Sequence, residues 1–429
     1  MKILLTGAGG FIGQHLLREL LAQGHRITVC SSRQQALLER YPSVGYCPVD
    51  YAQAQSVTDW LPHVQGMDAV INTVGIIDEN HAGQFTELHT TVPVALFKAC
   101  EQAQCKRVIQ VSALGADPNA STQYFISKGK ADAALQMLDL DWFVIRPSLV
   151  YGTAGKSFSM LKALAALPLI PLLGDGNQQL QPVSIDDLVK AVVLCLDENT
   201  QPCQVINAVG AESLSYAEML AILRRCQGMS QARYLSISPV IWRCLTPLSG
   251  WLKEPALNSD ALSMLESGNT ADPKPFTRHL GRQPQAFTAL LQDFIPDQAQ
   301  RWHARLYFLR PVLRLSLALM WLWAGWVSLF VYPHDQSYQL LTQVGINASF
   351  APLVLYVAST LDFVLGIALL MNWYLPLVVG FQLLAMLIYS VVITLALPEF
   401  WAHPFGPMIK NLPIAVATIV LLILEEDSV

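Results

Sequence analysis

The sequence predicts a doubly wound α/β fold with a parallel sheet, followed by an all-α four-helix membrane bundle. Three observations predict it. A strand-like run, a glycine-rich turn and an amphipathic helix open the chain, strand-like and helical stretches then alternate, and charged residues almost disappear after Arg314. Alternating strands and helices are typical of a doubly wound parallel sheet. Apolar runs of about 20 residues are long enough to cross a bilayer.

The first element is a strand over 2–6, followed by the glycine-rich turn and a helix that runs to Gln23. Glycines at these spacings allow a tight turn, close approach of the backbone to a pyrophosphate, and close packing of the helix on the strand. The helix N-terminus offers free N–H groups and a positive dipole end to the phosphates. This pattern predicts a Rossmann-type NAD(P)-binding domain. Its expected cofactor-binding residues here are Thr6, Gly7, Gly9, Gly10, Phe11, Ile12 and Gly13.

Further strand-like runs follow along the chain. They are 26–30, 44–48, 69–73, 107–111 and 142–146. The second strand is followed by Ser32 and Arg33, where a site that prefers NAD usually has an acid to hold the ribose hydroxyls. Because no acid stands there, Arg33 favours NADP(H), with NAD(H) still possible. The alternative is that Arg33 lies in an ordinary surface loop.

Two later strand ends also predict cofactor contacts. Asp50 follows the third strand and could reach the adenine edge. Asn72, Val74 and Gly75 end the fourth strand, where the backbone has to pass close to the cofactor.

The residues expected to carry chemistry are Ser112, Tyr124 and Lys128. Ser112 ends the strand over 107–111, and Tyr124 and Lys128 lie one turn apart on one face of the next helix. Hydride transfer to a carbonyl requires a proton for the nascent alkoxide. A tyrosine whose pKa is lowered by a nearby ammonium can deliver it, while a serine hydroxyl holds the carbonyl oxygen. Tyr-x-x-x-Lys alone could occur by chance among 13 tyrosines, so its placement after this strand is the informative feature.

Together these motifs resemble the short-chain dehydrogenase/reductase superfamily, in its extended and atypical branch. The closest likeness is to the group that contains the Rossmann-type accessory subunit of respiratory complex I. The likeness covers roughly residues 1–295 and is carried by 6–13 (TGAGGFIG), 111–117 (VSALGAD), Tyr124 with Lys128, 146–152 (RPSLVYG) and 181–187 (QPVSIDD).

The resemblance implies catalytic or catalytic-like positions for Ser112, Tyr124 and Lys128, and it implies that Pro147 and Val150 lie near the nicotinamide. One position departs from the pattern, because His89 aligns where extended members often have an asparagine. In the complex I branch the fold is understood to bind NADPH tightly and to serve structure. The resemblance therefore supports cofactor binding more strongly than turnover.

The bulk composition excludes some function classes. A net charge of −5 gives no sign of nucleic-acid binding. All eight cysteines precede the apolar tail, and none forms a CxxC pair or a zinc-like His cluster, so we expect reduced thiols and no metal site. The apolar start of the chain breaks at Thr6 without a small-residue cleavage site, so a signal peptide is not expected.

The rest of the chain divides into a lobe, a connector and a membrane domain. We expect the NAD(P)-binding domain over 1–152, a substrate lobe over 153–297, a basic juxtamembrane connector over 298–314 and a membrane domain over 315–429. In the lobe, the proline-broken apolar segment 167–176 either lines a pocket for a hydrophobic substrate or packs between lobes.

Three apolar runs of the membrane domain approach bilayer length, namely 315–332, 352–371 and 376–397. The run 412–424 is shorter and spans only if it extends back through Lys410. Four arginines (Arg301, Arg305, Arg310 and Arg314) precede the first span, whereas the loop 333–351 has no Lys or Arg. The positive-inside rule then places residues 1–310 in the cytoplasm, at the inner membrane, and four spans return the acidic residues 425–427 to the same side.

The membrane half resembles the DoxX-like family through 310–326, 361–366 and 398–411. That resemblance implies a four-helix bundle, and some members belong to quinone-linked oxidoreductase complexes. Asp362 lies mid-span, where a charge is costly unless it is neutral, paired or hydrated. It is either a functional residue with Arg314, Lys410 or His403 as partner, or an interhelical hydrogen-bonding group.

Three functions follow from these features. The first is a membrane-anchored NAD(P)-dependent oxidoreductase, of the reductase/dehydrogenase or epimerase-like type, acting on a hydrophobic, lipid- or quinone-related carbonyl or alcohol. The second is a non-catalytic NADPH-binding structural, assembly or redox-sensing protein that docks a membrane protein partner. A transporter is least favoured, because four spans with one mid-membrane acid offer little pathway.

Overall fold

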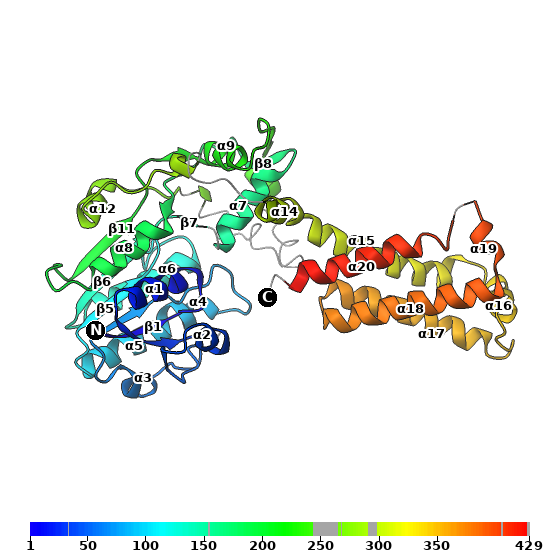
Figure 1. Ribbon diagram of the computed structural model, residues 1–429, viewed down its shortest axis with the longest axis horizontal. Coiled ribbons are helices and arrows are strands. Elements are labelled where there is room, and N and C mark those ends of the chain that lie inside the picture. The colour runs from blue at the N-terminus through cyan, green and yellow to red at the C-terminus, as the bar shows by residue number, and fades with distance from the viewer. Residues whose placement is uncertain are drawn as a thin grey trace. The chain divides into compact units, whose positions relative to one another are not determined.

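The computed structural model describes residues 1–32, 34–152, 155–242, 265–266, 268–290, 298–404 and 406–426. The chain forms two compact units, the N-terminal unit Met1–Ala304 and the C-terminal unit Arg305–Val429. Each unit has its own hydrophobic cores. The elements of both are labelled in Figure 1.

A seven-stranded parallel sheet with the order β11-β6-β5-β4-β1-β2-β3 forms the centre of the N-terminal unit. The strands are β1 (Lys2–Thr6), β2 (Arg26–Cys30), β3 (Gly45–Tyr46), β4 (Ala69–Asn72), β5 (Arg107–Val111), β6 (Asp141–Pro147) and β11 (Gln204–Ala208). This confirms the doubly wound fold. The third strand is shorter than predicted, and β11 was not among the predicted strands.

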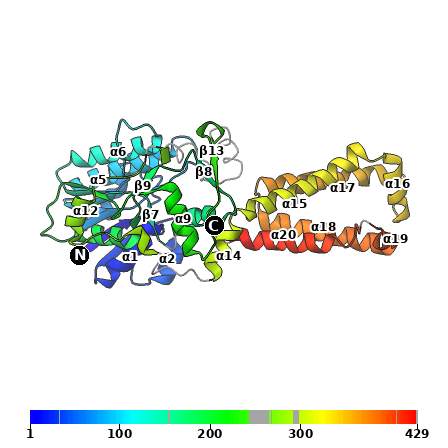
Figure 2. The same cartoon turned by 90° about the horizontal axis from the view of Figure 1, so that it is seen from above.

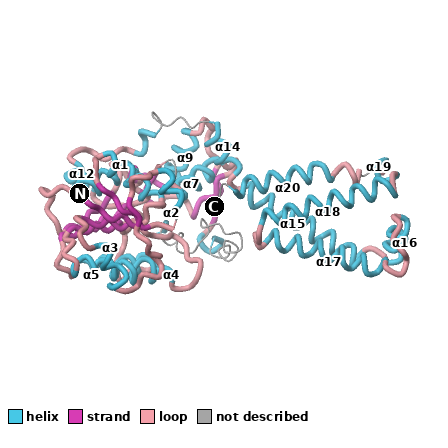
Figure 3. Tube along the Cα trace, turned by 60° about the horizontal axis from the view of Figure 1, so that its bottom comes forward, coloured by secondary structure: helices cyan, strands magenta, loops and turns pink. Residues whose placement is uncertain are grey.

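Helices cover both faces of this sheet. One face carries α1 (Phe11–Ala22) and α8 (Ile185–Leu194), whose apolar side chains share a core with β1 and β2. The other face carries α3 (Val57–Val64), α5 (Val92–Gln102) and α6 (Gln123–Gln136). Figures 2 and 3 show α1 and α5 on opposite sides of the strands. The strand order reverses at β1, which is where open α/β sheets bind ligands.

Smaller elements complete this part of the unit. They are α2 (Gln34–Arg40), α4 (Gln84–Thr86), η1 (Glu87–Thr91) and α12 (Pro273–Leu280). The side chains of Leu37 and Phe276 join the same core as α1 and α8.

A second lobe packs around a separate core. It contains the helices α7 (Lys156–Ala166), α9 (Tyr216–Cys226) and η3 (Phe287–Ala289). It also contains three pairs of short strands, formed by β7 (Val150–Tyr151) with β10 (Val183–Ser184), β9 (Gln179–Leu180) with β12 (Leu214–Ser215), and β8 (Ile170–Leu173) with β13 (Tyr234–Ile237). Strand β8 occupies part of the predicted apolar loop 167–176. Because Ile170 and Leu172 lie inside the lobe core, this segment packs within the lobe.

The C-terminal unit is helical. Its helices are α15 (Leu309–Trp326), η4 (Val327–Val331), α16 (His334–Gln343), α17 (Ala351–Leu370), α18 (Leu375–Ala396), α19 (Glu399–Ala402) and α20 (Asn411–Glu426), while α14 (Gln298–Leu306) crosses the boundary between the units. Among the described residues, three helical stretches are long and apolar enough to span a membrane, namely Leu309–Val331, Ala351–Leu370 and Leu375–Ala396.

The fourth apolar helix, α20, is shorter and packs against α15 and α18. It begins at Asn411, so the predicted extension back through Lys410 does not form. At its other end, Glu425 lies 3.5 Å from Arg314 and 3.8 Å from Arg310. The end of α20 therefore lies beside the start of α15. Two of the four arginines that precede the first span, Arg310 and Arg314, are thus engaged inside the unit.

Candidate functional site

The glycine-rich turn lies at the carboxyl end of β1, next to the point where the strand order reverses. Gly7 has a φ of +76°, and a methyl group there would lie 2.7 Å from Thr73 Oγ1. A methyl group at Gly13 would lie 2.1 Å from the carbonyl oxygen of Gly7. The turn and α1 can pack this closely only because both positions lack a side chain. Gly10 precedes α1 without a side-chain cap, so the helix N-terminus fits a pyrophosphate.

Asn72 connects the ends of three strands below this turn. Its side chain is fully buried, accepts a hydrogen bond from Thr6 Oγ1 at 2.5 Å and donates one to Gln110 Oε1 at 2.7 Å. Its oxygen also lies 3.3 Å from the Val74 amide, which donates to it. Thr6 and Asn72 therefore fix the backbone around the predicted cofactor site, and their side chains are engaged within the protein.

The part of the predicted cofactor site that would hold the adenosine is exposed. Ser32 and Asp50 lie on the surface, and the Asp50 carboxylate accepts a hydrogen bond from the Ala52 amide at 3.1 Å. Arg33, the residue on which the NADP(H) preference depends, lies outside the described residues.

Tyr124 and Lys128 lie side by side on α6, and both are almost fully buried. The Lys128 Nζ atom is 5.6 Å from the centre of the Tyr124 ring. It also lies 3.2 Å from the position that a methyl group would take at Gly75, at the end of β4. The rings of Phe85 and His89 pack edge-on against Tyr124, with centroids 5.8 and 5.5 Å away. The structure thus brings Tyr124, Lys128 and Gly75 together.

The pKa of Tyr124 is raised, whereas the sequence predicts that it is lowered. Burial raises the pKa of the Tyr124 phenol to about 12, and no lowering by the Lys128 ammonium accompanies it. The ammonium lies over the ring, and its own pKa is lowered by burial to about 8 despite the opposing charge of Asp132. The prediction of a lowered tyrosine pKa is therefore wrong for this arrangement, because desolvation outweighs the neighbouring charge.

His89 is held as a neutral ring between two elements. Its Nε2 atom accepts a hydrogen bond from the Ile76 amide at 3.0 Å, and Nδ1 lies 3.1 Å from Ser127 Oγ. Because Ser127 Oγ donates to the Tyr124 carbonyl oxygen at 2.9 Å, the His89 Nδ1–H is the donor to Ser127. Burial lowers the pKa of His89 to about 2, with the Lys128 charge as second cause. His89 therefore fixes the loop after β4 against α6.

Asp132 is a site residue that the sequence reasoning missed. Its carboxylate is fully buried, accepts a hydrogen bond from Ser112 Oγ at 2.8 Å, and pairs with two nitrogens of Arg146 at 2.9 Å each. Burial raises the pKa of Asp132, although Arg146 and Ser112 both oppose that change. The only available signal was its spacing, one helical turn after Lys128.

This arrangement changes the expected role of Ser112. A hydroxyl has a single proton to donate, and the Ser112 proton goes to Asp132. Ser112 therefore presents an acceptor to its other neighbours, whereas holding a carbonyl oxygen requires a donor.

Pro147 is the last residue of β6, next to the Ser112 strand, and Val150 begins β7 three residues later. The Pro147 carbonyl oxygen accepts a hydrogen bond from the Leu114 amide at 2.9 Å, and Val150 pairs with Val183 between β7 and β10. Both residues lie at the carboxyl edge that also carries the glycine turn and Ser112.

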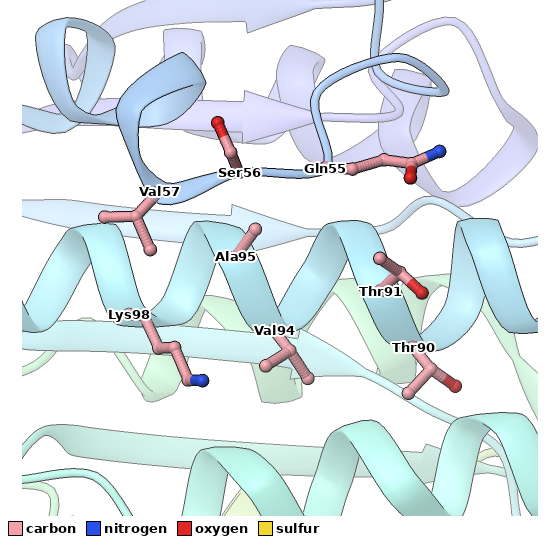
Figure 4. A pocket seen from close by; sticks show the side chains of 8 residues that line it. All are labelled: Gln55, Ser56, Val57, Thr90, Thr91, Val94, Ala95 and Lys98. Atoms are coloured by element: carbon pink, nitrogen blue, oxygen red, sulfur yellow. The ribbon is translucent and has the colours of Figure 1, made fainter.

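A pocket of about 380 Å³ lies elsewhere, between the start of α3 and the outer side of α5 (Figure 4). Its lining residues include Gln55, Thr91 and Lys98. None of the predicted site residues lines it.

Two family models match the chain in separate regions. Residues 3–208 match the NAD dependent epimerase/dehydratase family. That region is therefore similar to NAD dependent epimerase/dehydratase domains. Residues 318–419 match the DoxX-like family. The resemblances proposed from the sequence are thus confirmed, and the glycine turn with α1 provides the cradle that such a domain offers a dinucleotide.

Curated relatives include both an electron-transport subunit and an enzyme. The chain is 21% identical over 315 residues to the mitochondrial NADH-ubiquinone oxidoreductase 40 kDa subunit of Neurospora crassa, covering 71% of this chain and 80% of that protein. It is 26% identical over 195 residues to the ceramide reductase of Caulobacter vibrioides, covering 45% and 60%. It spans about half the length of other complex I relatives.

Solved structures support the fold of the N-terminal unit. A UDP-glucuronic acid 4-epimerase from Bacillus cereus, in complex with NAD, aligns at a TM-score of 0.52 with 20% identity, covering 69% of this chain and 99% of that one. At this identity the likeness shows the shared fold.

Proposed function

We propose that this chain is a membrane-anchored NAD(P)-dependent oxidoreductase that acts on a hydrophobic carbonyl or alcohol. The observation that carries the proposal is the burial of Tyr124 and Lys128 side by side against Gly75, at the carboxyl edge of the sheet. A phenol and an ammonium at this edge suit proton transfer to a substrate oxygen. The DoxX-like domain and the three candidate spans supply the membrane attachment.

The cofactor is proposed to lie along the glycine turn. The backbone of Gly7–Gly13 and the N-terminus of α1 would hold the pyrophosphate, and Gly75 leaves room at the end of β4. When bound, NAD(P)H supplies the hydride. The Arg33 position favours NADP(H), while the solved relatives in complex with NAD keep NAD(H) open.

Tyr124 is proposed to donate the proton to the substrate oxygen, because the high pKa of its phenol keeps it protonated at neutral pH. Lys128, with a pKa of about 8, is mostly charged at pH 7 and lies over the Tyr124 ring, beside Gly75 at the edge where the cofactor is proposed to pass. Ser112 donates its proton to Asp132, so it supports the position of α6 against β5.

Two findings favour a hydrophobic substrate. One relative is a ceramide reductase, whose name describes an enzyme that acts on a lipid. The other is the covalent connection of this domain to a unit whose helices expose large apolar side chains. We also propose that the N-terminal unit lies on the cytoplasmic side of the inner membrane, from the arginines that precede the first span.

The decisive experiment replaces Tyr124. In full-length protein in lipid nanodiscs, Tyr124→Phe is expected to lower NADPH oxidation in the presence of a lipid extract by at least about 100-fold, because it removes the proton donor. NADPH binding, followed by its fluorescence, should persist. Tyr216→Phe, which removes a hydroxyl from the core of the second lobe, is the matched control and should retain activity. Activity that survives Tyr124→Phe would refute the assignment.

The alternative is a non-catalytic NADPH-binding protein that serves assembly or redox sensing. Two observations favour it, namely the engagement of the Ser112 proton by Asp132 and the similarity to a complex I subunit. It predicts that bound NADPH stays reduced across a broad substrate screen and that a membrane protein partner co-purifies in stoichiometric amount. Oxidation of the bound NADPH by the lipid extract would argue against it.

A further inference from the structure

Buried polar side chains meet inside the helical bundle of the C-terminal unit. Trp321 on α15, Asp362 on α17, Gln382 on α18 and Thr418 on α20 are each more than nine-tenths buried. Three of these positions lie well inside the stretches long enough to span a membrane. We call these four residues the polar layer.

Contacts between α15 and α17 place Trp321 and Asp362 at one height. A methyl group at Gly325 would lie 2.9 Å from the carbonyl oxygen of Ser359, and one at Gly366 would lie 2.7 Å from Leu322 Cγ. The residue numbers rise on one helix as they fall on the other, so the helices are antiparallel. Trp321 therefore lies within about one turn of Asp362, where small residues allow close helix packing.

Gln382 and Thr418 lie at one height by the same argument. Asn411 donates a hydrogen bond to Ser390 Oγ at 2.9 Å, which ties α20 to α18. At 1.5 Å per residue, Gln382 lies about 12 Å along α18 from that contact, and Thr418 lies about 10.5 Å along α20 in the same direction.

The two pairs belong to the same layer. The ion pair between Arg314 and Glu425 ties α15 to α20, and Trp321 and Thr418 each lie seven residues from it. Asp362 lies within about one turn of Trp321 and hydrogen-bonds Tyr389, on the face of α18 that also carries Gln382 two turns away. All four helices thus contribute a buried polar side chain to this part of the bundle.

Several atoms of this layer lack a hydrogen-bond partner. Within the described part of the chain, Trp321 Nε1, Asp362 Oδ1 and both amide atoms of Gln382 make no hydrogen bond. Thr418 donates to the Ile414 carbonyl oxygen of its own helix. Polar groups inside a membrane protein require partners, since hydrocarbon supplies none. Such a set of atoms from three helices is suited to a ligand.

The chemistry of these atoms defines the ligand. The Trp321 indole N–H and the Gln382 amide N–H are donors, and they require an acceptor. The Gln382 amide oxygen and the Asp362 oxygen are acceptors, and an ionised or amide oxygen requires a donor. A hydroxyl group both donates and accepts. The outer surface of these helices exposes apolar side chains, including those of Leu319, Leu361 and Leu384, so a ligand would arrive from the bilayer.

We propose that the polar layer binds the hydroxyl group of an apolar alcohol that is dissolved in the bilayer. The inference rests on the proposed function in one respect, since a hydrophobic alcohol is one of the substrate classes proposed for the N-terminal unit. The layer would then be a second binding site, within the membrane, for molecules of that class. Water offers the same hydroxyl chemistry and is the alternative source.

The test compares matched ligands on the full chain in phosphatidylcholine nanodiscs. 1-Dodecanol, dodecane and dodecyl methyl ether share the apolar body and differ in hydroxyl chemistry, since the ether only accepts. Thermal unfolding of the C-terminal unit is expected to shift upward by about 3 °C with 1-dodecanol and by less with the ether, with no specific shift for dodecane. Trp321 emission, isolated as the difference from Trp321→Phe, should change only with the alcohol.

Two variants test whether the polar layer is responsible for the response to the alcohol. Gln382→Leu should abolish the response to 1-dodecanol, whereas Gln339→Leu, the same change at an exposed position of α16, should retain it. Thr418→Val is a second variant in the polar layer and should weaken the response to 1-dodecanol. It replaces Gln382→Leu as the test if that variant fails to fold. Equal responses to alcohol and alkane, or an unchanged response in Gln382→Leu, would overturn the proposal and leave the layer to water or packing. The assay requires no turnover, so it is independent of whether NADPH is oxidised.

Discussion

Each unit buries an aspartate in the middle of a helix, and the two are treated differently. Asp132 in the N-terminal unit receives a serine hydroxyl and two guanidinium nitrogens. Asp362 in the C-terminal unit hydrogen-bonds Tyr389, and among the described residues no cation pairs with it. The conceivable partners Arg314 and Lys410 pair with Glu425 or lie exposed. Both carboxylates keep one oxygen, Oδ1, without a hydrogen-bond partner among the described residues. The difference between them is the counter-charge, because Arg146 pairs with Asp132 whereas Asp362 has a phenol beside it.

The largest effect is expected from removing the charge of Asp132. Asp132→Asn leaves Arg146 without its counter-charge and should destabilise the N-terminal unit by about 3 kcal/mol, the low end for a broken buried pair because Arg146 is partly exposed. Urea unfolding of the full chain, followed by loss of NADPH fluorescence, measures it. Asp139→Asn, an exposed position just after α6, should change stability by less than about 0.5 kcal/mol. Equal losses in the two variants would contradict the role given to the pair.

A pH effect of similar size is expected from Lys128. Its pKa is about 8 in the folded protein and near 10.5 when unfolded. Between pH 8 and 10.5 the unfolded chain binds more protons, so stability should rise with pH, by up to about 3 kcal/mol over the window. Urea unfolding of the full chain from pH 7.5 to 10 measures the rise. Lys128→Met should remove this rise in stability. A rise that persists in the variant would mean that a group other than Lys128 releases the proton on folding.

At acidic pH, the free energy of unfolding is expected to depend on the protonation of His89. Burial keeps its folded pKa near 2, whereas the unfolded value is 6.5. Below pH 6.5 the unfolded chain takes up the proton and the folded chain does not, so stability should fall by about 2 kcal/mol between pH 6.5 and 5. His89→Asn, the residue frequent in related sequences, should flatten this part of the profile. Unchanged acid sensitivity in that variant, with His63→Asn as the half-buried control, would show that another group is responsible.

Comparison with the sequence expectations shows what local patterns can predict. The glycine turn, the Tyr124–Lys128 spacing and the three long apolar runs are properties of contiguous residues, and the structure contains each as predicted. The partners of Asp132 are 20 and 14 residues away on two strands, so no local pattern reveals them.

The extent to which each side chain is buried is the second property that the sequence did not reveal. The pKa of Tyr124 was predicted to fall because Lys128 lies one turn away, yet desolvation by the surrounding rings raises it. For Asp362 the sequence left two alternatives, a charged partner or an interhelical hydrogen bond, and the structure has the hydrogen bond, from Tyr389 on the adjacent helix. The sequence shows which charged groups are near in the chain but not how much water surrounds them.

The smallest effect is expected from the counterpart change in the C-terminal unit, and it tests the comparison directly. Asp362→Asn keeps an oxygen that can accept the Tyr389 hydrogen bond and leaves no counter-charge unpaired. Its cost should therefore be less than about 1 kcal/mol, compared with about 3 kcal/mol for Asp132→Asn. Thermal unfolding of the full chain in nanodiscs, with Asp335→Asn at an exposed position of α16 as control, measures it. A loss as large as that of Asp132→Asn would mean that Asp362 has a charged partner, and the contrast between the two buried acids would then disappear.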